Sequence, residues 1–282
     1  MPKVVHTVAE LHKILQPLRR KGELVGFVPT MGALHAGHVS LMKLSRAGGN
    51  ALTVVSVFVN PLQFAPGEDY DEYPRDLGGD VKVARDAGVE VVFAPSVAEM
   101  YPRGFVTWTD QDKITEKLCG EHRPGHFRGV LTVVLKLLNI VRPDNAYFGQ
   151  KDYQQSVVIQ RMVTDLNLES KIHVCPIVRE ADGLALSSRN VYLGPKHRTE
   201  ALVLHQALVR AHELATGGER NVKKLYGEVK RIIGQSKSAK IDYIAIVHPE
   251  TLEDVNDVSG RTLIAVAVRF GKTRLIDNVL VE

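Results

Sequence analysis

Apolar and polar positions form alternating blocks along the chain up to about residue 178. The apolar runs "ELVGFVPT", "ALTVVSVFVN" and "VEVVFAP" predict buried strands, "KIHVCPIV" predicts another strand, and "AYFGQ" predicts a short one. Between them, "HAGHVSLMKLSRAGG", "VKVARDAG" and "DYQQSVVIQRMVTDLN" predict helices, and "GHFRGVLTVVLKLLNIVRPD" predicts a long buried helix. This alternation of strand and helix predicts an α/β fold with a doubly wound parallel sheet.

Local signals mark where some helices begin and end. In "HTVAELHKILQPLRRKG", Thr7 and Glu10 have the spacing of a capping box, and Gly22 closes the segment. The helix that begins near residue 36 is expected to end at Gly48.

The pattern changes after about residue 178. "PKHRTEALVLHQALVRAHELATGG" predicts one long amphipathic helix with Pro195 in its first turn, and "NVKKLYGEVKRIIGQ" predicts a second helix. "KIDYIAIVHP", "RTLIAVAVRF" and "KTRLIDNVLVE" predict strands, the last two joined by a turn at Gly271. We therefore expect two domains, an α/β domain over residues 1–177 and a smaller α+β domain over residues 178–282.

Composition narrows the class of protein. Apolar residues make up 44% of the 282 residues and charged residues 24%, which is the balance of a soluble globular protein. The net charge of +4 suits a small anionic substrate, and no basic block with interleaved aromatic residues indicates a nucleic-acid partner. Cys119 and Cys175 lack CxxC spacing, and a reducing cytoplasm is the simplest setting for them. We expect neither a signal peptide nor a membrane span.

Two histidines stand where a buried strand turns into a helix. In "VPTMGALHAGHVSL", His35 and His38 are three residues apart and therefore share one face of the helix, with Gly37 between them. A helix N-terminus at the carboxyl end of a parallel strand offers backbone N–H groups and a positive dipole end to an anion. We expect the imidazoles to bind phosphate oxygens of a nucleotide there.

Other interpretations of this pair stay open at the level of the sequence. A zinc site needs a third protein ligand, and no third ligand is evident. His35 as a cap of the turn and His38 as a surface residue would also explain the pattern. The segment contains neither GxxxxGK[ST] nor GxGxxG, so it is not one of the common glycine-rich phosphate loops.

Two further segments lie at strand ends. "VNPLQF" carries the neutral amides Asn60 and Gln63, which can recognise hydroxyls and a carboxylate, although an ordinary turn would explain it equally. It should lie beside the histidine loop, because it follows the neighbouring strand. "FGQKDYQQ" places Lys151 and Asp152 at a strand-to-helix junction, with Gln155 one turn along; a surface ion pair is the alternative.

Two more segments concentrate hydroxyl and cationic groups. "DGLALSSRN" offers Ser187, Ser188 and Arg189, which suit a polyphosphate, or else form a polar loop. "EHRPGHFRG" gathers cationic and imidazole groups before a helix, where they contact an anion or anchor the helix. Its members are Arg123, His126 and Arg128.

The order of these motifs is more specific than any one of them. "PTMGALHAGH", "FVNPLQF", "YPRD", "RPGHFRGV", "FGQKDYQQ" and "GLALSSRN", followed by "RLIDN", resemble the pantoate–β-alanine ligase (pantothenate synthetase) family, within the HxGH-bearing adenylate-forming nucleotidyltransferase-like group. The resemblance implies that ATP and pantoate form pantoyl-adenylate and that β-alanine then displaces AMP. It also implies a Rossmann-like first domain that binds ATP and pantoate, a second domain acting as a lid, a cytoplasmic homodimer and a requirement for Mg²⁺, without assigning the metal ligands.

The resemblance implies roles for individual positions. His38 takes the catalytic position, assisted by His35, Lys151 and Arg189. Pantoate is contacted by Gln63 and Gln155, β-alanine by Gln63, and Asn60 and Met31 belong to the same substrate site. The ATP contacts are Pro29, Thr30, Met31, Gly32, Ala33, Leu34, His35, Ala36, Gly37, His38, Gly149, Gln150, Lys151, Asp152, Val178, Leu186, Ser187, Ser188 and Arg189.

The chain departs from the wider group at one loop. Many relatives read Lys-Met-Ser-Lys-Ser there, and this chain has Leu186 for the methionine and Arg189 for a lysine, which keeps bulk and charge. Asp80, in "EYPRDLGGDVKV", is a candidate neighbour of a metal ion. Two other functions stay open: an enzyme that attaches AMP to a phosphate-bearing acceptor, and a nucleotide-sensing or RNA-binding module without catalysis.

Overall fold

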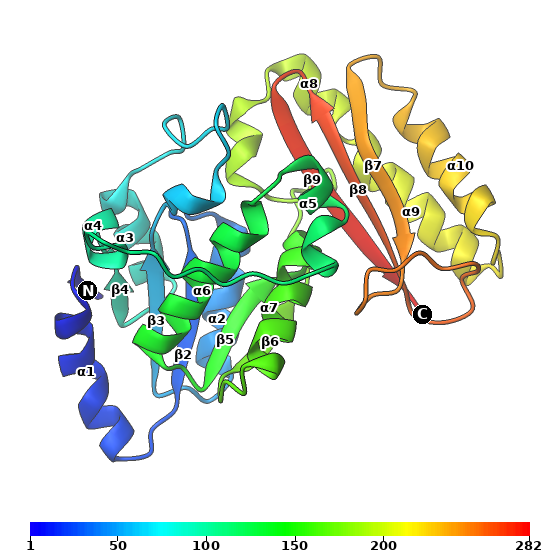
Figure 1. Ribbon diagram of the computed structural model, residues 1–282. Helices are drawn as coiled ribbons and strands as arrows, with labels where there is room; N and C mark the ends of the chain where they lie inside the picture. Colours follow the sequence, from blue (N-terminus) through cyan, green and yellow to red (C-terminus); the bar gives the residue numbers. More distant parts are fainter. The chain divides into compact units, whose positions relative to one another are not determined.

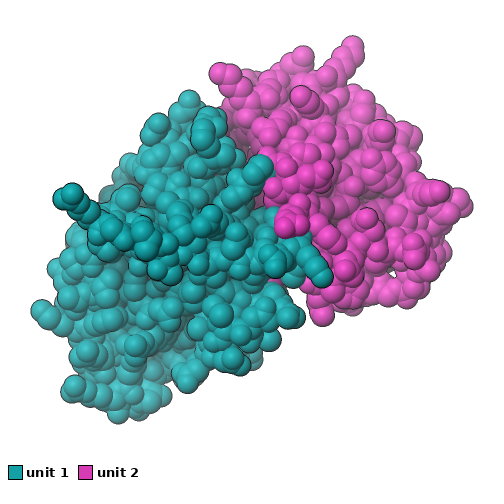
Figure 2. All heavy atoms as spheres, viewed as in Figure 1, with its two compact units in different colours: residues 1–115, 123–149, 158–176 teal, residues 116–122, 150–157, 177–282 magenta.

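The computed structural model describes residues 1–282, which group into two compact units (Figure 2). Unit 1 comprises residues 1–115, 123–149 and 158–176, and unit 2 comprises residues 116–122, 150–157 and 177–282. Two short segments that precede residue 177 therefore belong to the unit that contains the C-terminus.

Unit 1 is built on a six-stranded sheet in which every neighbouring pair is parallel, in the order β1-β4-β3-β2-β5-β6 (Figure 1). This confirms the doubly wound α/β prediction. The sheet changes winding direction at β2, which has β3 on one side and β5 on the other. Ligands of such sheets bind beyond the carboxyl ends of the strands at this switch point. The strands are β1 (Lys3–Val5), β2 (Val25–Thr30), β3 (Leu52–Val57), β4 (Val91–Phe93), β5 (Asn145–Gly149) and β6 (Lys171–Cys175).

Helices cover both faces of this sheet, with α6 on one face and α2 on the other (Figure 1). An apolar cluster that includes Met42, Val55 and Ala84 packs α2 and α3 against the strands. Helix α7 (Tyr153–Asp165) begins in unit 2 and continues into unit 1. The other helices of unit 1 are α1 (Val8–Arg20), α2 (Ala36–Ala47), η1 (Pro61–Gln63), α3 (Leu77–Asp86), α4 (Val97–Met100) and α6 (His126–Val141), and η2 (Ile114–Glu116) ends at its boundary with unit 2.

The predicted helix boundaries agree with the observed hydrogen bonds. Thr7 Oγ1 accepts from Glu10 N at 3.2 Å, and Glu10 Oε2 accepts from Thr7 N at 3.0 Å, so the capping box is confirmed. Helix α2 ends at Gly48, as expected. No helix of the chain has the length and apolar character needed to span a bilayer.

Strand register places the first two candidate loops side by side. Thr30, the last residue of β2, pairs with Val57, the last residue of β3. The segments that follow these strands therefore leave the sheet next to each other, which confirms the expected adjacency of the histidine loop and "VNPLQF".

Unit 2 contains an antiparallel sheet in the order β7-β8-β9, covered by two helices. Its apolar core joins Leu208 of α9 and Val229 of α10 to residues such as Val266 of β8. This confirms the smaller α+β part. Its elements are α5 (Cys119–His122), η3 (Gln150–Asp152), η4 (Ser188–Tyr192), α8 (Pro195–Glu200), α9 (Val203–Thr216), α10 (Val222–Ile233), β7 (Ala239–Val247), β8 (Thr262–Phe270) and β9 (Thr273–Val281).

Several elements differ from the sequence prediction. The short helices α4 and α5 were not predicted, and α3 begins at Leu77, before the predicted segment "VKVARDAG". The single long helix that begins at Pro195 is divided into α8 and α9, because the backbone tightens to three-residue bonds from Leu202 N to Thr199 O and from Leu204 N to Ala201 O. Strand β1 was not predicted, because three residues are too few to show a periodicity. It forms by pairing with β4 at the edge of the sheet.

Candidate functional site

The turn between β2 and α2 has an unusual backbone. Gly32 has φ +88° and Ala33 has φ +51°, so two successive residues are left-handed. Thr30 stabilises the turn, since its hydroxyl donates to Ser56 O at 2.6 Å and accepts from Gly32 N at 3.2 Å. A side chain at position 32 would meet Asp80, because a Cβ built there lies 2.7 Å from Asp80 Oδ2. Glycine is required on both counts.

Asp80 of α3 holds the same turn from the other side. Its Oδ2 accepts from Ala33 N at 3.2 Å and its Oδ1 from Leu34 N at 2.8 Å. The residue is 4% exposed, and this burial raises the pKa of its carboxyl although the two backbone bonds oppose the shift. The structure thus gives Asp80 an anchoring contact, and it contains no group of three or more His, Cys, Asp or Glu side chains suited to a metal ion.

These contacts alter the expected anion site. The amides of residues 32, 33 and 34 are already satisfied within the chain, and so are those of His35 and Gly37. The sequence-based picture of open backbone N–H groups along the loop is therefore wrong for these five positions. The capacity of the junction to bind an anion rests instead on the imidazoles and on the dipole of α2.

The Nδ1 atom of each histidine accepts a hydrogen bond from a main-chain N–H. His35 Nδ1 accepts from Gly37 N at 3.1 Å, and His38 Nδ1 accepts from His35 N at 3.3 Å. The half-buried rings lie 4.1 Å apart between centroids. Because a backbone N–H only donates, each Nδ1 is an acceptor and the proton of the neutral ring lies on Nε2. His35 does cap the helix, and the same bond makes its Nε2 a donor.

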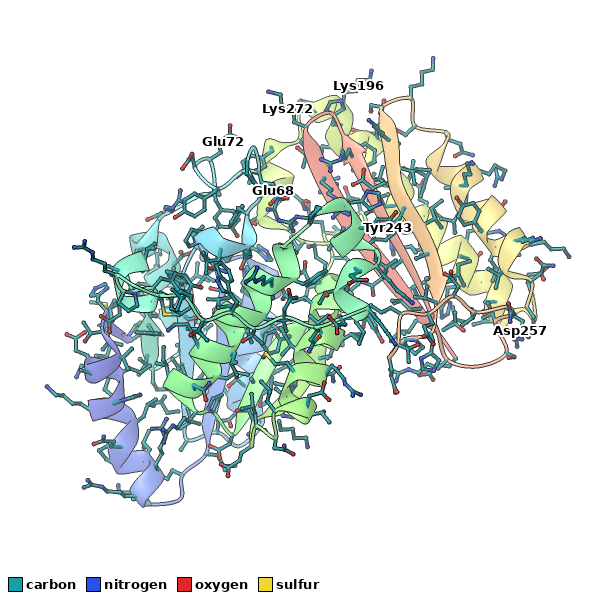
Figure 3. All side chains as sticks on the ribbon, viewed as in Figure 1. Glu68, Glu72, Lys196, Tyr243, Asp257 and Lys272 are labelled. Carbon is teal, nitrogen blue, oxygen red and sulfur yellow. The ribbon has the colours of Figure 1, made fainter.

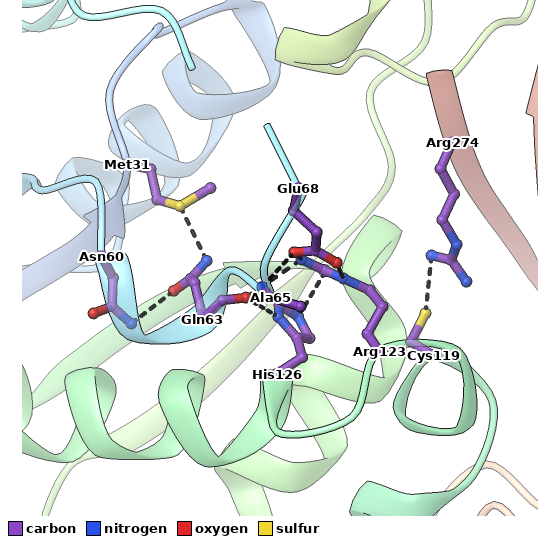
Figure 4. Close-up of polar contacts among 9 residues, drawn as sticks. All are labelled: Met31, Asn60, Gln63, Ala65, Glu68, Cys119, Arg123, His126 and Arg274. Carbon is purple, nitrogen blue, oxygen red and sulfur yellow. Dashed lines mark hydrogen bonds and ion pairs between the residues drawn. The ribbon is translucent and has the colours of Figure 1, made fainter. Parts of the chain in front are cut away.

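The Asn60 side chain is buried, and the main chain sets its orientation (Figure 4). Its Oδ1 accepts from Leu62 N at 3.3 Å, and its Nδ2 donates to Gly129 O at 3.1 Å. A main-chain N–H and a main-chain carbonyl have fixed polarity, so the amide can point only one way. Tyr101 must then donate to Oδ1, at 2.7 Å, and burial raises the pKa of this phenol, which keeps its proton in place.

The orientation of Asn60 is passed on to Gln63. Asn60 Nδ2 donates to Gln63 Oε1 at 3.1 Å, which turns Gln63 Nε2 towards Met31, 3.0 Å from its Sδ (Figure 4). The Oε1 atom of Gln63 is therefore occupied by Asn60, and its Nε2 is a donor that lies against Met31. Asn60 is 1% exposed, and its contacts are with the chain itself.

A cluster of Glu68, Arg123 and His126 contacts the main-chain carbonyl of Gln63. Arg123 donates to the Glu68 carboxylate from Nε at 2.7 Å and from Nη2 at 2.6 Å. Arg123 Nη1 lies 3.0 Å from His126 Nε2, and His126 Nδ1 lies 2.8 Å from Gln63 O (Figure 4). Burial acts to raise the pKa of Glu68, but the hydrogen bonds and charge of Arg123 outweigh it, and the pKa lies below its ordinary value of 4.5.

Replacement of Glu68 by glutamine is expected to flatten the acid dependence of stability. The folded pKa is lower than the unfolded one, so the carboxylate stabilises the fold above about pH 4.5 and the contribution is lost as pH falls through the folded pKa. Urea unfolding between about pH 3 and pH 6 measures this slope. Glu169→Gln, at an exposed carboxylate, should retain the slope of the unaltered chain, and an equal slope in Glu68→Gln would contradict the assignment.

Unit 2 carries the lysine motif on η3. Lys151 Nζ lies 3.6 Å from Asp152 Oδ2, so the ion pair considered from the sequence is present, with the lysine largely buried. Asn278 of β9 positions this turn, because its Nδ2 donates to Gln150 O at 3.0 Å and to Lys151 O at 3.1 Å. Its Oδ1 accepts from Gln150 Nε2 at 3.2 Å.

The serine–arginine motif is held by the same strand. Arg179 forms two bonds with the buried Asp277 carboxylate, at 2.6 and 2.9 Å. Leu186 N donates to Val178 O at 3.0 Å, and Ser187 caps η4 by accepting from Arg189 N at 3.2 Å.

The structure thus assembles the sequence-predicted residues in two groups. Unit 1 brings together Met31, Asn60 and Gln63 beside the turn that carries His35 and His38, with Gly149 at the end of β5. Unit 2 brings the η3 and η4 motifs onto β9. The members of the second group are Gln150, Lys151, Asp152, Gln155, Val178, Leu186, Ser187, Ser188 and Arg189.

Sequence reasoning missed the residues that hold these groups in place. Asp80, Tyr101 and Arg179 gave no recognisable signal as anchors, because each acts on a partner far along the chain. Asp277 and Asn278 did give a signal. They are two polar residues inside the otherwise apolar segment "RLIDNVLV", where a buried polar side chain needs a partner.

Comparison with known proteins gives consistent results over the whole chain. Residues 3–280 match the family described as pantoate-beta-alanine ligase. A pantothenate synthetase of Acetivibrio thermocellus is 55% identical over 280 residues, which cover 99% of each chain. One of Geobacter sulfurreducens is 52% identical and covers 98% of this chain and 97% of its own.

Solved structures agree with the sequence relatives. The crystal structure of pantothenate synthetase from Thermus thermophilus has a TM-score of 0.94 and 48% identity and covers 99% of each chain. The pantoate-beta-alanine ligase of Francisella tularensis has a TM-score of 0.82 and 37% identity and covers 99% of this chain and 98% of its own. That structure is described as complexed with beta-gamma ATP and beta-alanine.

Proposed function

The chain belongs to the pantoate-beta-alanine ligase family, and on that premise we propose how its residues join pantoate to β-alanine at the expense of ATP. The observation that carries the assignment is the family match over residues 3–280. The donor-presenting histidine pair and Gln63 supply the local chemistry that this reaction needs.

The first step makes the carboxyl group of pantoate reactive. A pantoate carboxylate oxygen attacks the α-phosphorus of ATP, the bond to the β-phosphate oxygen breaks, and pyrophosphate leaves with that electron pair. The nucleophile is already an anion, so the step needs no base. Catalysis then depends on alignment and on stabilising charge at the phosphates.

The histidines act as neutral hydrogen-bond donors in this step. His35 and His38 direct Nε2–H at phosphate oxygens, while each Nδ1 continues to accept a hydrogen bond from a main-chain N–H. Protonation of Nδ1 would place two donors against each other and break the cap. The pair therefore stabilises charge, and His38 does not supply a proton to the phosphates.

The substrate acid is bound by side-chain amides. Gln63 donates from Nε2 to a pantoate oxygen and later to the β-alanine carboxylate, and Gln155 contacts pantoate. Asn60 acts through Gln63, since its own groups are bonded within the chain. Met31, in contact with Gln63, offers an apolar surface to the methyl groups of pantoate.

The remaining residues serve ATP. Lys151 and Arg189 offset charge on the phosphates, with help from the hydroxyls of Ser187 and Ser188, and Asp152 binds the ribose hydroxyls. The same proposal assigns further nucleotide contacts to other positions of these loops, through groups other than the amides that are bonded within the chain. These are Pro29, Thr30, Met31, Gly32, Ala33, Leu34, Ala36, Gly37, Gly149, Gln150, Val178 and Leu186.

The second step forms the amide. The neutral amine of β-alanine attacks the acyl carbon of pantoyl-adenylate, the bond to the phosphate oxygen breaks, and AMP leaves with that electron pair. The attacking nitrogen releases one proton. The products are pantothenate and AMP.

Three further properties belong to the proposal. Mg²⁺ fits as an ion carried by the ATP phosphates, because it prefers phosphate oxygens with few protein ligands and the chain has no cluster of three or more candidate side chains. Bound there, it neutralises phosphate charge. The proposal also includes a homodimer and a cytoplasmic location. The thiols of Cys119 and Cys175, neither of which forms a disulfide, suit a reducing compartment.

Substrate omission tests the reaction directly. With ATP, Mg²⁺, pantoate and β-alanine, we expect pantothenate, AMP and pyrophosphate in equal amounts, measured by chromatography. With β-alanine omitted, labelled pyrophosphate should still exchange into ATP, because the adenylate forms first. When a phosphate-bearing acceptor replaces pantoate, a stable adenylylated product without AMP would indicate transfer to that acceptor. Absence of turnover with either acceptor would indicate a binding module.

A further inference from the structure

The main-chain carbonyl of Gln63 receives two side-chain donors from the segment that begins α6. His126 Nδ1 lies 2.8 Å from this oxygen and Arg123 Nη2 lies 3.4 Å from it (Figure 4). Both come from residues about 60 positions further along the chain. The backbone of the residue proposed to bind the substrate acid is thus held at its carbonyl, while Asn60 sets its amide.

The chemistry of Arg123 decides which atom donates and which accepts in each hydrogen bond of this cluster. A guanidinium carries only donors, so His126 Nε2, 3.0 Å from Arg123 Nη1, must accept. The ring proton of a neutral His126 therefore lies on Nδ1, from which it donates to Gln63 O. This is the opposite tautomer to that of His35 and His38.

Arg123 is itself held rigidly. Its Nε and Nη2 donate to the two oxygens of Glu68, and Glu68 Oε2 also accepts from Ala65 N at 3.2 Å. The side chains of Arg123 and Glu68 are 15% and 23% exposed (Figure 3 labels Glu68). A forked pair of this kind fixes an angle as well as a distance.

We propose that Arg123 and His126, anchored by Glu68, are positioning residues that set where Gln63 presents its amide to the substrate acid. The inference rests on the proposed role of Gln63. If these residues were only structural anchors, their loss would lower the stability of the fold and would not change the affinity for pantoate relative to that for ATP. A positioning role affects pantoate and leaves ATP unchanged, because a small displacement of a substrate-binding group lowers its effectiveness by ~10- to 10²-fold.

Two amide substitutions at position 126 separate the two bonds of the ring. In His126→Asn the side-chain nitrogen stands near the place of Nδ1 and can still donate to Gln63 O. In His126→Gln the amide stands near the place of Nε2, where it keeps the bond from Arg123 and loses the one to Gln63. We expect the KM for pantoate to rise by ~10-fold or more in His126→Gln and by much less in His126→Asn, with the KM for ATP unchanged in both.

The matched control lies at the other end of α6. His12 Nε2 lies 2.9 Å from Ile140 O, so His12→Asn perturbs another contact between an imidazole and a main-chain carbonyl of α6 and should leave the KM for pantoate unchanged. Thermal unfolding reports whether each variant folds. If His126→Gln does not fold, Arg123→Lys, which keeps the charge and loses the fork, should show the same selective rise in KM.

Two results would overturn the proposal. One is a folded His126→Gln with an unaltered KM for pantoate, and the other is an equal rise in the KM values for pantoate and ATP. Failure of the proposed function looks different, because the unaltered chain would then form no AMP from pantoate and β-alanine.

Discussion

Replacement of His38 by alanine is expected to slow pantoate-dependent exchange of pyrophosphate into ATP by about 10²-fold or more, because one preorganised donor to the phosphates is removed. The fold should persist, since the half-buried ring lies at the beginning of α2 and outside the apolar core of unit 1. The exchange of labelled pyrophosphate tests the loss of rate, and thermal unfolding of the same preparation tests whether the fold persists.

Matched variants separate the loss of the ligand contact from the loss of the cap. His38→Asn keeps an acceptor near the place of Nδ1 and removes Nε2–H, so we expect it to be as slow as the alanine variant. His248 is a suitable control, because its Nδ1 also accepts main-chain N–H groups, from Glu250 and Thr251. His248→Ala should exchange at the normal rate. Normal exchange in a folded His38→Asn would remove the donor role from His38.

The second large effect is expected at Gly129. There η1, which carries Gln63, lies directly on α6, and a Cβ at position 129 would overlap the Leu62 carbonyl and lie 2.7 Å from Gln63 Cα. These are backbone atoms and cannot move aside independently. Gly129→Ala is expected to lower the free energy of unfolding by about 1–3 kcal/mol. By displacing Gln63, it should also lower kcat/KM for pantoate by ~10²-fold.

The control is a glycine in a helix with space around it. Gly227 of α10 has nothing within 4 Å of a built Cβ, so Gly227→Ala should stabilise the fold by about 0.5–1 kcal/mol and leave kcat/KM unchanged. Urea unfolding and initial rates measure both quantities. Equal stability of Gly129→Ala and the unaltered chain would show that η1 moves away from α6 at no cost.

Much of the fold could be predicted from local pattern. Five of the six parallel strands, the capping box of α1 and the three C-terminal strands were recognisable, because runs of apolar residues and helix-capping residues can be identified from neighbouring positions. Strand β1 was missed because it depends on pairing with β4, more than 80 positions away. The division of the helix at Ala201 was also missed, because packing decided it; Ala201 and Leu204 are both buried in the core of unit 2.

The residue types and their order along the chain already indicate which chemical groups the site contains. The order of the motifs indicated the family, and the residue types indicated imidazoles, amides and cations for an acid and a nucleotide. Such motifs can be recognised locally, since each consists of a few neighbouring residues at the end of a strand.

How those groups are used depends on contacts between residues that are far apart along the chain. Gln63 is a donor because Asn60 faces it, and Asn60 is oriented by Gly129 O, 69 positions along, with Tyr101 donating to it from 41 positions along. Two amides of the histidine turn, those of Ala33 and Leu34, are occupied because Asp80 reaches them from α3. The polarity of a hydrogen bond is set by the partner, and a partner brought in by folding leaves no trace in the neighbouring sequence.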